Sequence, residues 1–194
     1  MRLLHALAGF VLFFELPIPI YWLMIHPLNL FWRKRVRAAF SIAGLAAWIT
    51  GGILLWTFHS ALMAKTRPSW VAIAGGLALV GVETYLIWRV ERELGTQRLI
   101  GHAELKGTGE LFTGGLYAHM RHPRYLGMFC AVAGVALLAG TLRLWLVLAV
   151  WWPFALAVIR LEERELERRF GAAYSAYRKR VPAFLPLRIG RHGN

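Results

Sequence analysis

Cysteine and aspartate are scarce in this chain of 194 residues, which has Cys130 as its one cysteine and ten acidic residues that are all glutamate. A single cysteine excludes a disulfide framework and a thiolate metal site, and Cys130 fits an apolar packing role. The seven histidines lack the i, i+4 arrangement of a helical zinc site, so we predict no bound metal. A Gly-x-Gly-x-x-Gly fingerprint is also missing, and no Rossmann domain is expected.

Apolar residues are what the chain has in excess. They make up 58% of the sequence and include nine tryptophans, more than a soluble domain of this length needs for its core. Because about 20 apolar residues cross a bilayer, we predict an all-α integral membrane protein. Its five spans are expected at residues 3–25, 38–58, 70–88, 125–139 and 144–159.

The last two predicted spans are short and joined by Gly140-Thr141-Leu142-Arg143, which indicates a helical hairpin followed by a cytoplasmic C-terminal helix. No linker or repeat divides the chain, so we expect one polytopic domain, with three N-terminal spans in residues 1–93. A cleaved signal peptide is the alternative for the first span. That span is long, contains Glu15 and two prolines, and lacks a cleavage site, which favours a kinked, retained helix.

Lys and Arg give the predicted orientation. They gather after the first, third and fifth predicted spans, and only Arg2, Lys65, Arg67 and Arg143 fall on the other side. Since cytoplasmic loops retain positive charge, we expect the N-terminus outside. Basic cytoplasmic loops that favour anionic lipid headgroups explain the net charge of +13 without a nucleic-acid partner.

The most informative segment is Gly114–Gly127. It places Arg121-His122-Pro123-Arg124-Tyr125 between a glycine pair and an apolar span. After the hairpin, Glu162 and Glu163 begin a charged helix that returns to the same membrane surface. A carboxylate at this boundary is costly without a partner. We therefore predict that the two segments build one site on the cytoplasmic side.

Several of these residues also have purely structural interpretations. Pro123 is favourable in the first turn of a helix, and Arg121 and Arg124 can anchor that helix at headgroups. The spacing of Phe170, Tyr174 and Tyr177 favours packing over catalysis.

The remaining acidic residues are less informative. Glu91 and Glu93 are typical of a solvated helix end. Glu15 and Glu83 lie within predicted spans, where an ionisable residue suggests function, although an ion pair of Glu83 with Arg89 or a loop residue is an equally good interpretation.

Together these residues carry a resemblance to a known family. The segment from about residue 94 to 187 is similar to isoprenylcysteine carboxyl methyltransferases, in the superfamily that also holds phospholipid N-methyltransferases. The shared elements, in order, are a glycine-x-Tyr (Gly115–Tyr117), an Arg-His-Pro-x-Tyr (Arg121–Tyr125), a short hairpin, a Glu-Glu pair (Glu162-Glu163), a Phe-Gly-x-x-Tyr-x-x-Tyr (Phe170–Tyr177) and a Val-Pro (Val181-Pro182). The N-terminal spans match only in being apolar. The N-terminal half is short compared with that of eukaryotic members, so the resemblance implies a protein of a prokaryotic plasma membrane.

The resemblance implies an integral membrane methyltransferase that uses S-adenosylmethionine, with a cofactor-binding catalytic core in residues 94–194. Its substrate would be a lipid-like molecule that enters from the bilayer, with a carboxylate such as that of a prenylcysteine as the preferred acceptor. The cofactor-binding residues it implies are Glu110, Leu111 and Phe112 at the adenine, then Tyr117, His122, Pro123, Arg124 and Tyr125, and Glu162 from the returning helix.

We assign catalytic roles to Arg121 and Glu163. The guanidinium of Arg121 can orient the acceptor carboxylate or the methionyl carboxylate of the cofactor, and Glu163, like Glu162, can pair with the cofactor ammonium.

One departure from the family pattern concerns the acceptor. Carboxyl-methylating relatives tend to carry an arginine one turn before the Glu pair, where this chain has Val158. Another lipid acid, a phospholipid amine or a membrane-soluble thiol therefore stays open as the acceptor. A sterol-reductase-like enzyme using NADPH and a non-catalytic membrane scaffold are the alternative functions.

Overall fold

The computed structural model describes residues 2–62, 67–95 and 110–184, and within these ranges every regular element is helical. Lys65, Arg98 and Lys106, which entered the predicted orientation, lie outside the described residues. The elements are α1 (Arg2–Glu15), α2 (Pro17–Ile25), α3 (Asn29–Arg33), α4 (Val36–Ala38), the π-helical turn η1 (Ala39–Ala43), α5 (Gly44–Leu62), α6 (Trp70–Leu94), the 3₁₀ turn η2 (Gly115–Ala118), α9 (Pro123–Ala139), α10 (Leu142–Phe170) and α11 (Ala172–Arg180).

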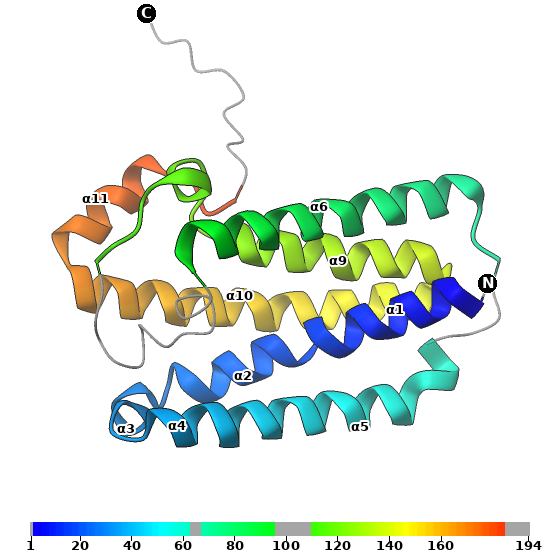
Figure 1. Ribbon diagram of the computed structural model, residues 1–194, viewed down its shortest axis with the longest axis horizontal. Coiled ribbons are helices and arrows are strands. Elements are labelled where there is room, and N and C mark those ends of the chain that lie inside the picture. Colours follow the sequence, from blue (N-terminus) through cyan, green and yellow to red (C-terminus); the bar gives the residue numbers. More distant parts are fainter. Residues whose placement is uncertain (1, 63–66, 96–109, 185–194) are drawn as a thin grey trace, which may run out of the picture.

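The long helices lie side by side in an elongated bundle (Figure 1). Helix α9 packs along α6 and α1 and also contacts α10, while α2 packs against α5. Glycine allows a close backbone contact between α6 and α9: a Cβ atom added to Gly76 would lie 2.7 Å from the carbonyl oxygen of Gly134. Small residues in these helices therefore let two backbones approach closely, as is common in membrane proteins.

In the described part of the chain, four helical stretches are long and apolar enough to cross a membrane, namely Leu3–Ile25, Val36–Ser60, Trp70–Leu94 and Leu142–Phe170. The predicted fourth span is the shorter α9, with 17 residues. Helix α9 ends at Gly140, which has φ of 64°, and the Thr141 hydroxyl caps α10 by accepting a hydrogen bond from the Arg143 amide at 3.3 Å. The predicted hairpin is thus a tight turn between two helices.

The predicted fifth span and the charged helix expected after it, up to Gly171, form one continuous helix. Helix α10 does not stop near residue 159 but continues unbroken to Phe170, so Glu162 and Glu163 lie in the same helix as the apolar span. The reason is that Leu, Glu and Arg are all good helix formers. Charged residues end the apolar pattern without ending the helix.

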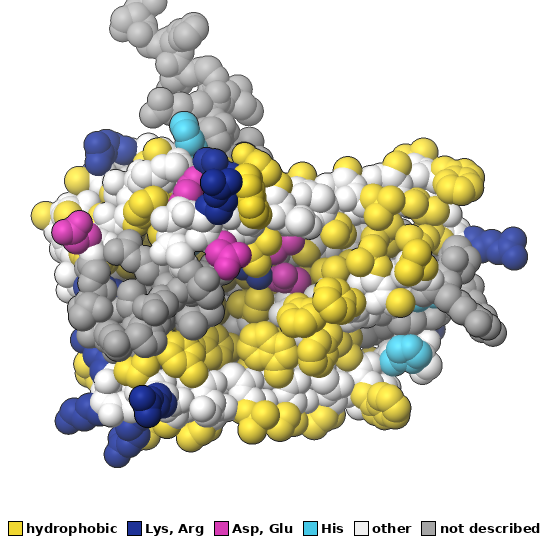
Figure 2. All heavy atoms as spheres, viewed as in Figure 1, with side chains coloured by type: hydrophobic (Ala, Val, Ile, Leu, Met, Phe, Trp, Pro, Cys, Tyr) yellow, Lys and Arg dark blue, Asp and Glu magenta, His cyan; other side chains and the backbone are white. Residues whose placement is uncertain are grey.

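The outer surface of the bundle is apolar. Trp56, Trp70 and Val71 are among many large hydrophobic side chains that are exposed, and on the face in Figure 2 such side chains cover the long helices. Lys and Arg side chains gather mainly at the end where α10 meets α11. Long apolar helices whose outer surface is also apolar indicate an integral membrane protein.

Candidate functional site

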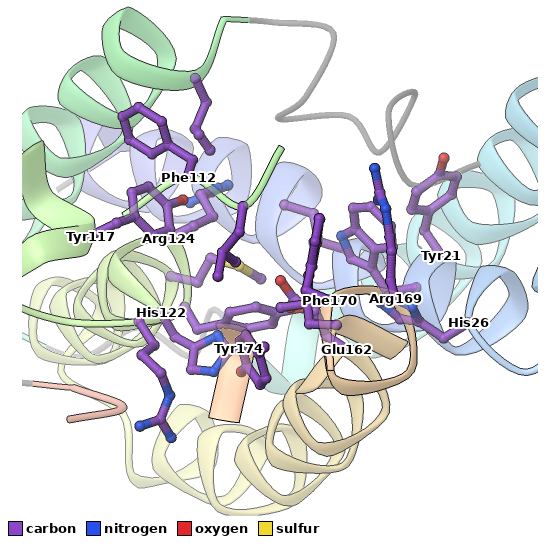
Figure 3. Close-up of a pocket in the computed structure, with 18 of the residues that line it drawn as sticks. Tyr21, His26, Phe112, Tyr117, His122, Arg124, Glu162, Arg169, Phe170 and Tyr174 are labelled. Carbon is purple, nitrogen blue, oxygen red and sulfur yellow. The ribbon is translucent and has the colours of Figure 1, made fainter. Parts of the chain in front are cut away.

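A cavity of about 470 Å³ lies at the end of the bundle where α2, α6, α9 and α10 come together with α11. Its walls come from both halves of the chain. The C-terminal half contributes the segment before η2, the start of α9 and the end of α10, and the N-terminal half contributes α2, η1 and α5. Figure 3 shows residues of these elements surrounding one space.

Most of the site residues predicted from the sequence meet at this cavity. His122 at the start of α9 and Glu162 on α10 line the same space, so the chain does fold back to bring the two segments together. Pro123 and Glu163 are not among the lining residues. Those that line the cavity are Glu110, Leu111, Phe112, Tyr117, Arg121, His122, Arg124, Tyr125 and Glu162.

Glu163 lies behind the cavity wall and holds two of the lining residues. Its Oε1 accepts hydrogen bonds from Arg121 Nε at 3.0 Å, from Arg121 Nη2 at 2.7 Å and from His122 Nε2 at 3.0 Å. Because a carboxylate oxygen only accepts, this contact assigns the proton to His122 Nε2. The Glu163 side chain is 11% exposed and that of His122 is 2% exposed, so the contacts are shielded from water.

Arg121 also ties α9 to the segment that follows α11. Its Nη1 donates to the carbonyl oxygens of Arg178 at 3.1 Å and Val181 at 2.5 Å, and its backbone amide donates to Pro182 at 2.9 Å. Helix α11 is thereby clamped over the Arg-His-Pro segment. The guanidinium has a fixed geometry before any ligand binds.

Arg124 is held from the other side, by the two glutamates of the predicted spans. Its guanidinium donates to Glu83 on α6 and to both carboxylate oxygens of Glu15 on α1 at 3.3 Å. Both glutamates are 7% exposed, and a side chain at Gly127 would collide with Glu83. The interpretation of Glu83 as a structural ion-pair residue is confirmed, but its partner is Arg124 rather than Arg89.

Glu93 at the end of α6 positions the turn that carries Tyr117. Its carboxylate accepts from the Leu116 amide at 2.8 Å and pairs with Arg89 at 2.8 Å. Gly115 has φ of 55°, and a Cβ atom there would meet the Glu93 carboxylate. The interpretation of Glu93 as part of a solvated helix end is therefore wrong, because its carboxylate binds the η2 turn. No sequence pattern predicts that this turn lies beside Glu93.

Helix α11 closes the site by packing. Tyr174, Tyr177 and Val181 form a buried cluster with Leu111, Leu166 and Phe170, which confirms the packing interpretation, and the tyrosines and Phe170 also line the cavity. The Tyr177 hydroxyl donates to the Tyr117 carbonyl oxygen at 2.7 Å. Burial raises the pKa of Tyr177 to about 12, so the phenol keeps the proton that it donates at neutral pH.

The N-terminal wall was not predicted from the sequence. It consists of aromatic and apolar residues and one histidine. The sequence signal that could have indicated it is the His26-Pro27 break after the first span, which falls on the same predicted side of the membrane as His122. Arg169, two turns beyond Glu162 on α10, was also missed. The N-terminal lining residues are Ile18, Tyr21, Trp22, His26, Phe40, Gly44 and Trp48, together with Ile87 and Leu94 of α6.

Comparisons with known proteins find a matching family model and several relatives. A family model described as "Phospholipid methyltransferase" matches residues 71–173, more than half of the chain. Protein-S-isoprenylcysteine O-methyltransferase of Schizosaccharomyces pombe is 41% identical over 78 residues, covering 40% of this chain and 33% of that protein. The human enzyme of the same name is 28% identical over 153 residues, covering 76% and 51%.

A bacterial relative matches over more of the chain. Methanethiol S-methyltransferase 2 of Bradyrhizobium diazoefficiens is 29% identical over 162 residues, covering 82% of this chain and 54% of that protein. The chain thus spans about one third to one half of the length of these relatives. No solved structure matches the chain.

Proposed function

Because the chain belongs to the phospholipid methyltransferase family, we propose that it is a membrane enzyme that transfers a methyl group from S-adenosylmethionine to a carboxylate on a lipid-like acceptor. The observation that carries this proposal is the single cavity lined by His122, from the start of α9, and by Glu162, from α10. The relatives that are named O-methyltransferases of isoprenylcysteine support the carboxylate.

The cavity suits the proposed cofactor. Its volume of about 470 Å³ is in the range of roughly 300–1,000 Å³ of small-molecule sites. The Glu162 carboxylate and the rings of Phe112, Tyr117 and Tyr125 provide a negative charge and π faces, which suit a ligand with an ammonium and a sulfonium. The backbone from Glu110 to Phe112 would hold the adenine. When bound there, S-adenosylmethionine supplies a methyl group on a positively charged sulfur.

The protein contributes by positioning the reacting atoms and excluding water from the cavity, rather than by acid or base catalysis. Methyl transfer requires donor and acceptor atoms in line, so a fixed arrangement lowers the barrier, and a carboxylate acceptor has no proton to lose. Arg121 lines the cavity, and its guanidinium is already bound to Glu163. We infer that Glu163 acts by holding Arg121 and His122 in place, and that the tyrosines of α11 keep water out.

The proposed membrane arrangement follows from charge and surface. Lys and Arg in the loops at the cavity end favour a cytoplasmic site and an N-terminus outside, in a prokaryotic plasma membrane. Exposed apolar side chains continue along the helices toward the cavity end. An acceptor with an apolar tail would therefore reach the cavity from the bilayer.

A thiol is the second candidate acceptor. It is favoured by the match of methanethiol S-methyltransferase 2 over 82% of this chain. A thiol must lose its proton on methylation, whereas a carboxylate need not. Both acceptors would use the same cofactor, so cofactor binding does not distinguish them. The product does, because a carboxylate gives a methyl ester and a thiol gives a methyl thioether.

The proposal is tested with detergent-purified protein, tritiated S-adenosylmethionine and NADPH as the competing ligand. We expect binding of S-adenosylmethionine, no binding of NADPH, and transfer of label to an organic-phase product with added N-acetyl-S-farnesylcysteine. Glu162→Gln is expected to weaken cofactor binding roughly 10-fold or more, since it removes a charge-assisted contact. Glu167→Gln, an exposed position on the same helix, is the matched control. Binding of NADPH alone would refute the proposal.

A further inference from the structure

The cavity has two chemically different sides. In Figure 3, Tyr117 and His122 lie on one side, while Tyr21, His26 and Arg169 lie on the other. The first side holds the residues that the family resemblance assigns to the cofactor. The second side is built by the N-terminal half and by the last turns of α10. The resemblance implies no role for the residues on this side.

His26, on this second side, carries a buried polar atom that has no hydrogen-bond partner among the described residues. Its side chain is 3% exposed, and its Nδ1 lies 2.8 Å from Glu165 Oε2 on α10. Its Nε2 is buried and has no hydrogen-bond partner among the described residues, although the residue lines the cavity. A buried polar atom without a partner costs free energy, and a ligand in the cavity would satisfy it.

The ring of His26 is also fixed in orientation. The Trp22 ring stacks on it at 5.0 Å between centroids with an interplanar angle of 20°, and Glu165 accepts from Nδ1 because a carboxylate only accepts. These two contacts leave Nε2 as the one free position of the ring. A ligand at Nε2 would therefore meet a preorganised group.

Positive charge and apolar surface accompany this nitrogen. Arg169 lines the cavity from α10, with its guanidinium 4.9 Å from the centroid of the Phe170 ring. The rings of Tyr21, Phe40 and Trp48 complete the wall. A carboxylate ligand only accepts hydrogen bonds, so Nε2 would donate the hydrogen bond to it. The wall thus suits a carboxylate attached to an apolar chain.

We propose that His26 and Arg169 bind the carboxylate of the methyl acceptor, and that Tyr21, Phe40 and Trp48 cover the adjoining part of its chain. This inference rests on the proposed methyltransferase function and adds the acceptor site to it. Position 158, where an orienting arginine would be expected, holds a valine that is fully buried in the core. The acceptor group is therefore bound from other elements in this chain.

The arrangement is consistent with the chemistry of ester formation. A carboxylate oxygen forms the new bond to the methyl carbon while the carbon–sulfur bond breaks and its electron pair stays on sulfur. The products are a methyl ester and a neutral thioether, and no proton changes place. His26 therefore binds and orients the acceptor without acting as a base.

The test compares variants of purified full-length protein with N-acetyl-S-farnesylcysteine and with palmitate as acceptors. For His26→Ala and Arg169→Ala we expect the acceptor KM to rise roughly 10- to 100-fold, the effect of losing a charge-assisted hydrogen bond, while the Kd for S-adenosylmethionine stays within about twofold. Arg169→Lys should restore part of the loss. His59→Ala and Arg168→Ala, which change exposed residues, are the matched controls.

His26→Asn separates ligand binding from a tether between α2 and α10. Asparagine can keep the contact with Glu165 through its amide, but it removes the buried Nε2 that has no partner among the described residues. We expect it to be as impaired as His26→Ala. Wild-type KM in His26→Asn, or in both alanine variants, would overturn the acceptor site while leaving the methyltransferase intact.

The acceptor and the cofactor provide two further outcomes. A wild-type protein that methylates thiols or amines but neither acid would overturn the carboxylate site alone. A wild-type protein that binds no S-adenosylmethionine would overturn the proposed function, and the acceptor site with it.

Discussion

At the scale of single residues, the Glu pair shows how adjacent side chains take different roles. Successive residues of an α-helix point about 100° apart, so Glu162 lines the cavity while Glu163 turns toward Arg121 and His122. The sequence indicates that this pair matters, since carboxylates at a membrane boundary need partners. It cannot assign the two roles, because those depend on the helix rotation that packing sets.

Glu163→Gln should therefore differ from Glu162→Gln in a measurable way. The Glu163 carboxylate accepts three hydrogen bonds from charged or ring donors, and weakening such contacts costs about 1.5–3 kcal/mol. We expect the Tm in detergent to fall by roughly 3–10 °C together with turnover, whereas Glu162→Gln keeps a wild-type Tm and loses cofactor affinity. A lowered Tm in Glu162→Gln with a wild-type Tm in Glu163→Gln would contradict these roles.

At the scale of elements, three helices are joined by one buried charge network. Arg124 on α9 binds Glu15 on α1 and Glu83 on α6, so the position of the cavity wall depends on two spans whose function the sequence left open. The sequence identified both glutamates as unusual within apolar helices. Their common partner could not be predicted from the sequence. Arg124 is 109 positions from Glu15 and 41 positions from Glu83, and pairing over such separations is set by the packing of the bundle.

Removing Arg124 alone should be far more harmful than removing the whole network. Arg124→Met leaves two buried carboxylates without a positive partner, and breaking a buried ion pair in this way costs about 3–5 kcal/mol. We expect its Tm in detergent to fall by on the order of 10 °C. The triple variant Glu15→Gln, Glu83→Gln, Arg124→Met should recover most of that loss, since no unpaired charge remains.

This comparison distinguishes a structural ion network from a cofactor contact. Thermal unfolding reports the first, and the Kd for S-adenosylmethionine reports the second. A triple variant that is stable but no longer binds the cofactor would show that Arg124 contacts it directly, as the family resemblance implies. A triple variant that is as unstable as Arg124→Met would contradict the charge argument.

At the scale of the whole molecule, the two halves of the chain differ in how far the sequence predicts them. The C-terminal half carries its polar chemistry in compact motifs, and His122 and Glu162 do meet at one cavity. The N-terminal half offers long apolar runs, from which spans follow but contacts do not. His26 and Trp48 reach the cavity because α2 packs on α5 and contacts α10, and apolar periodicity alone does not specify such packing.

The orientation of the whole bundle can be tested because the chain has one cysteine. In a Cys130→Ala background, His59→Cys and Lys179→Cys place exposed thiols at opposite ends of the bundle, one near the end of α5 and one on α11 beside the cavity (Figure 1). The concentration of Lys and Arg at the cavity end predicts that this end is cytoplasmic. A membrane-impermeant maleimide should therefore label His59→Cys in intact cells and Lys179→Cys only after permeabilisation. The reverse pattern would place the cavity outside the cell, without access to a cytoplasmic pool of the cofactor, and would refute the proposed orientation even if the purified protein binds S-adenosylmethionine.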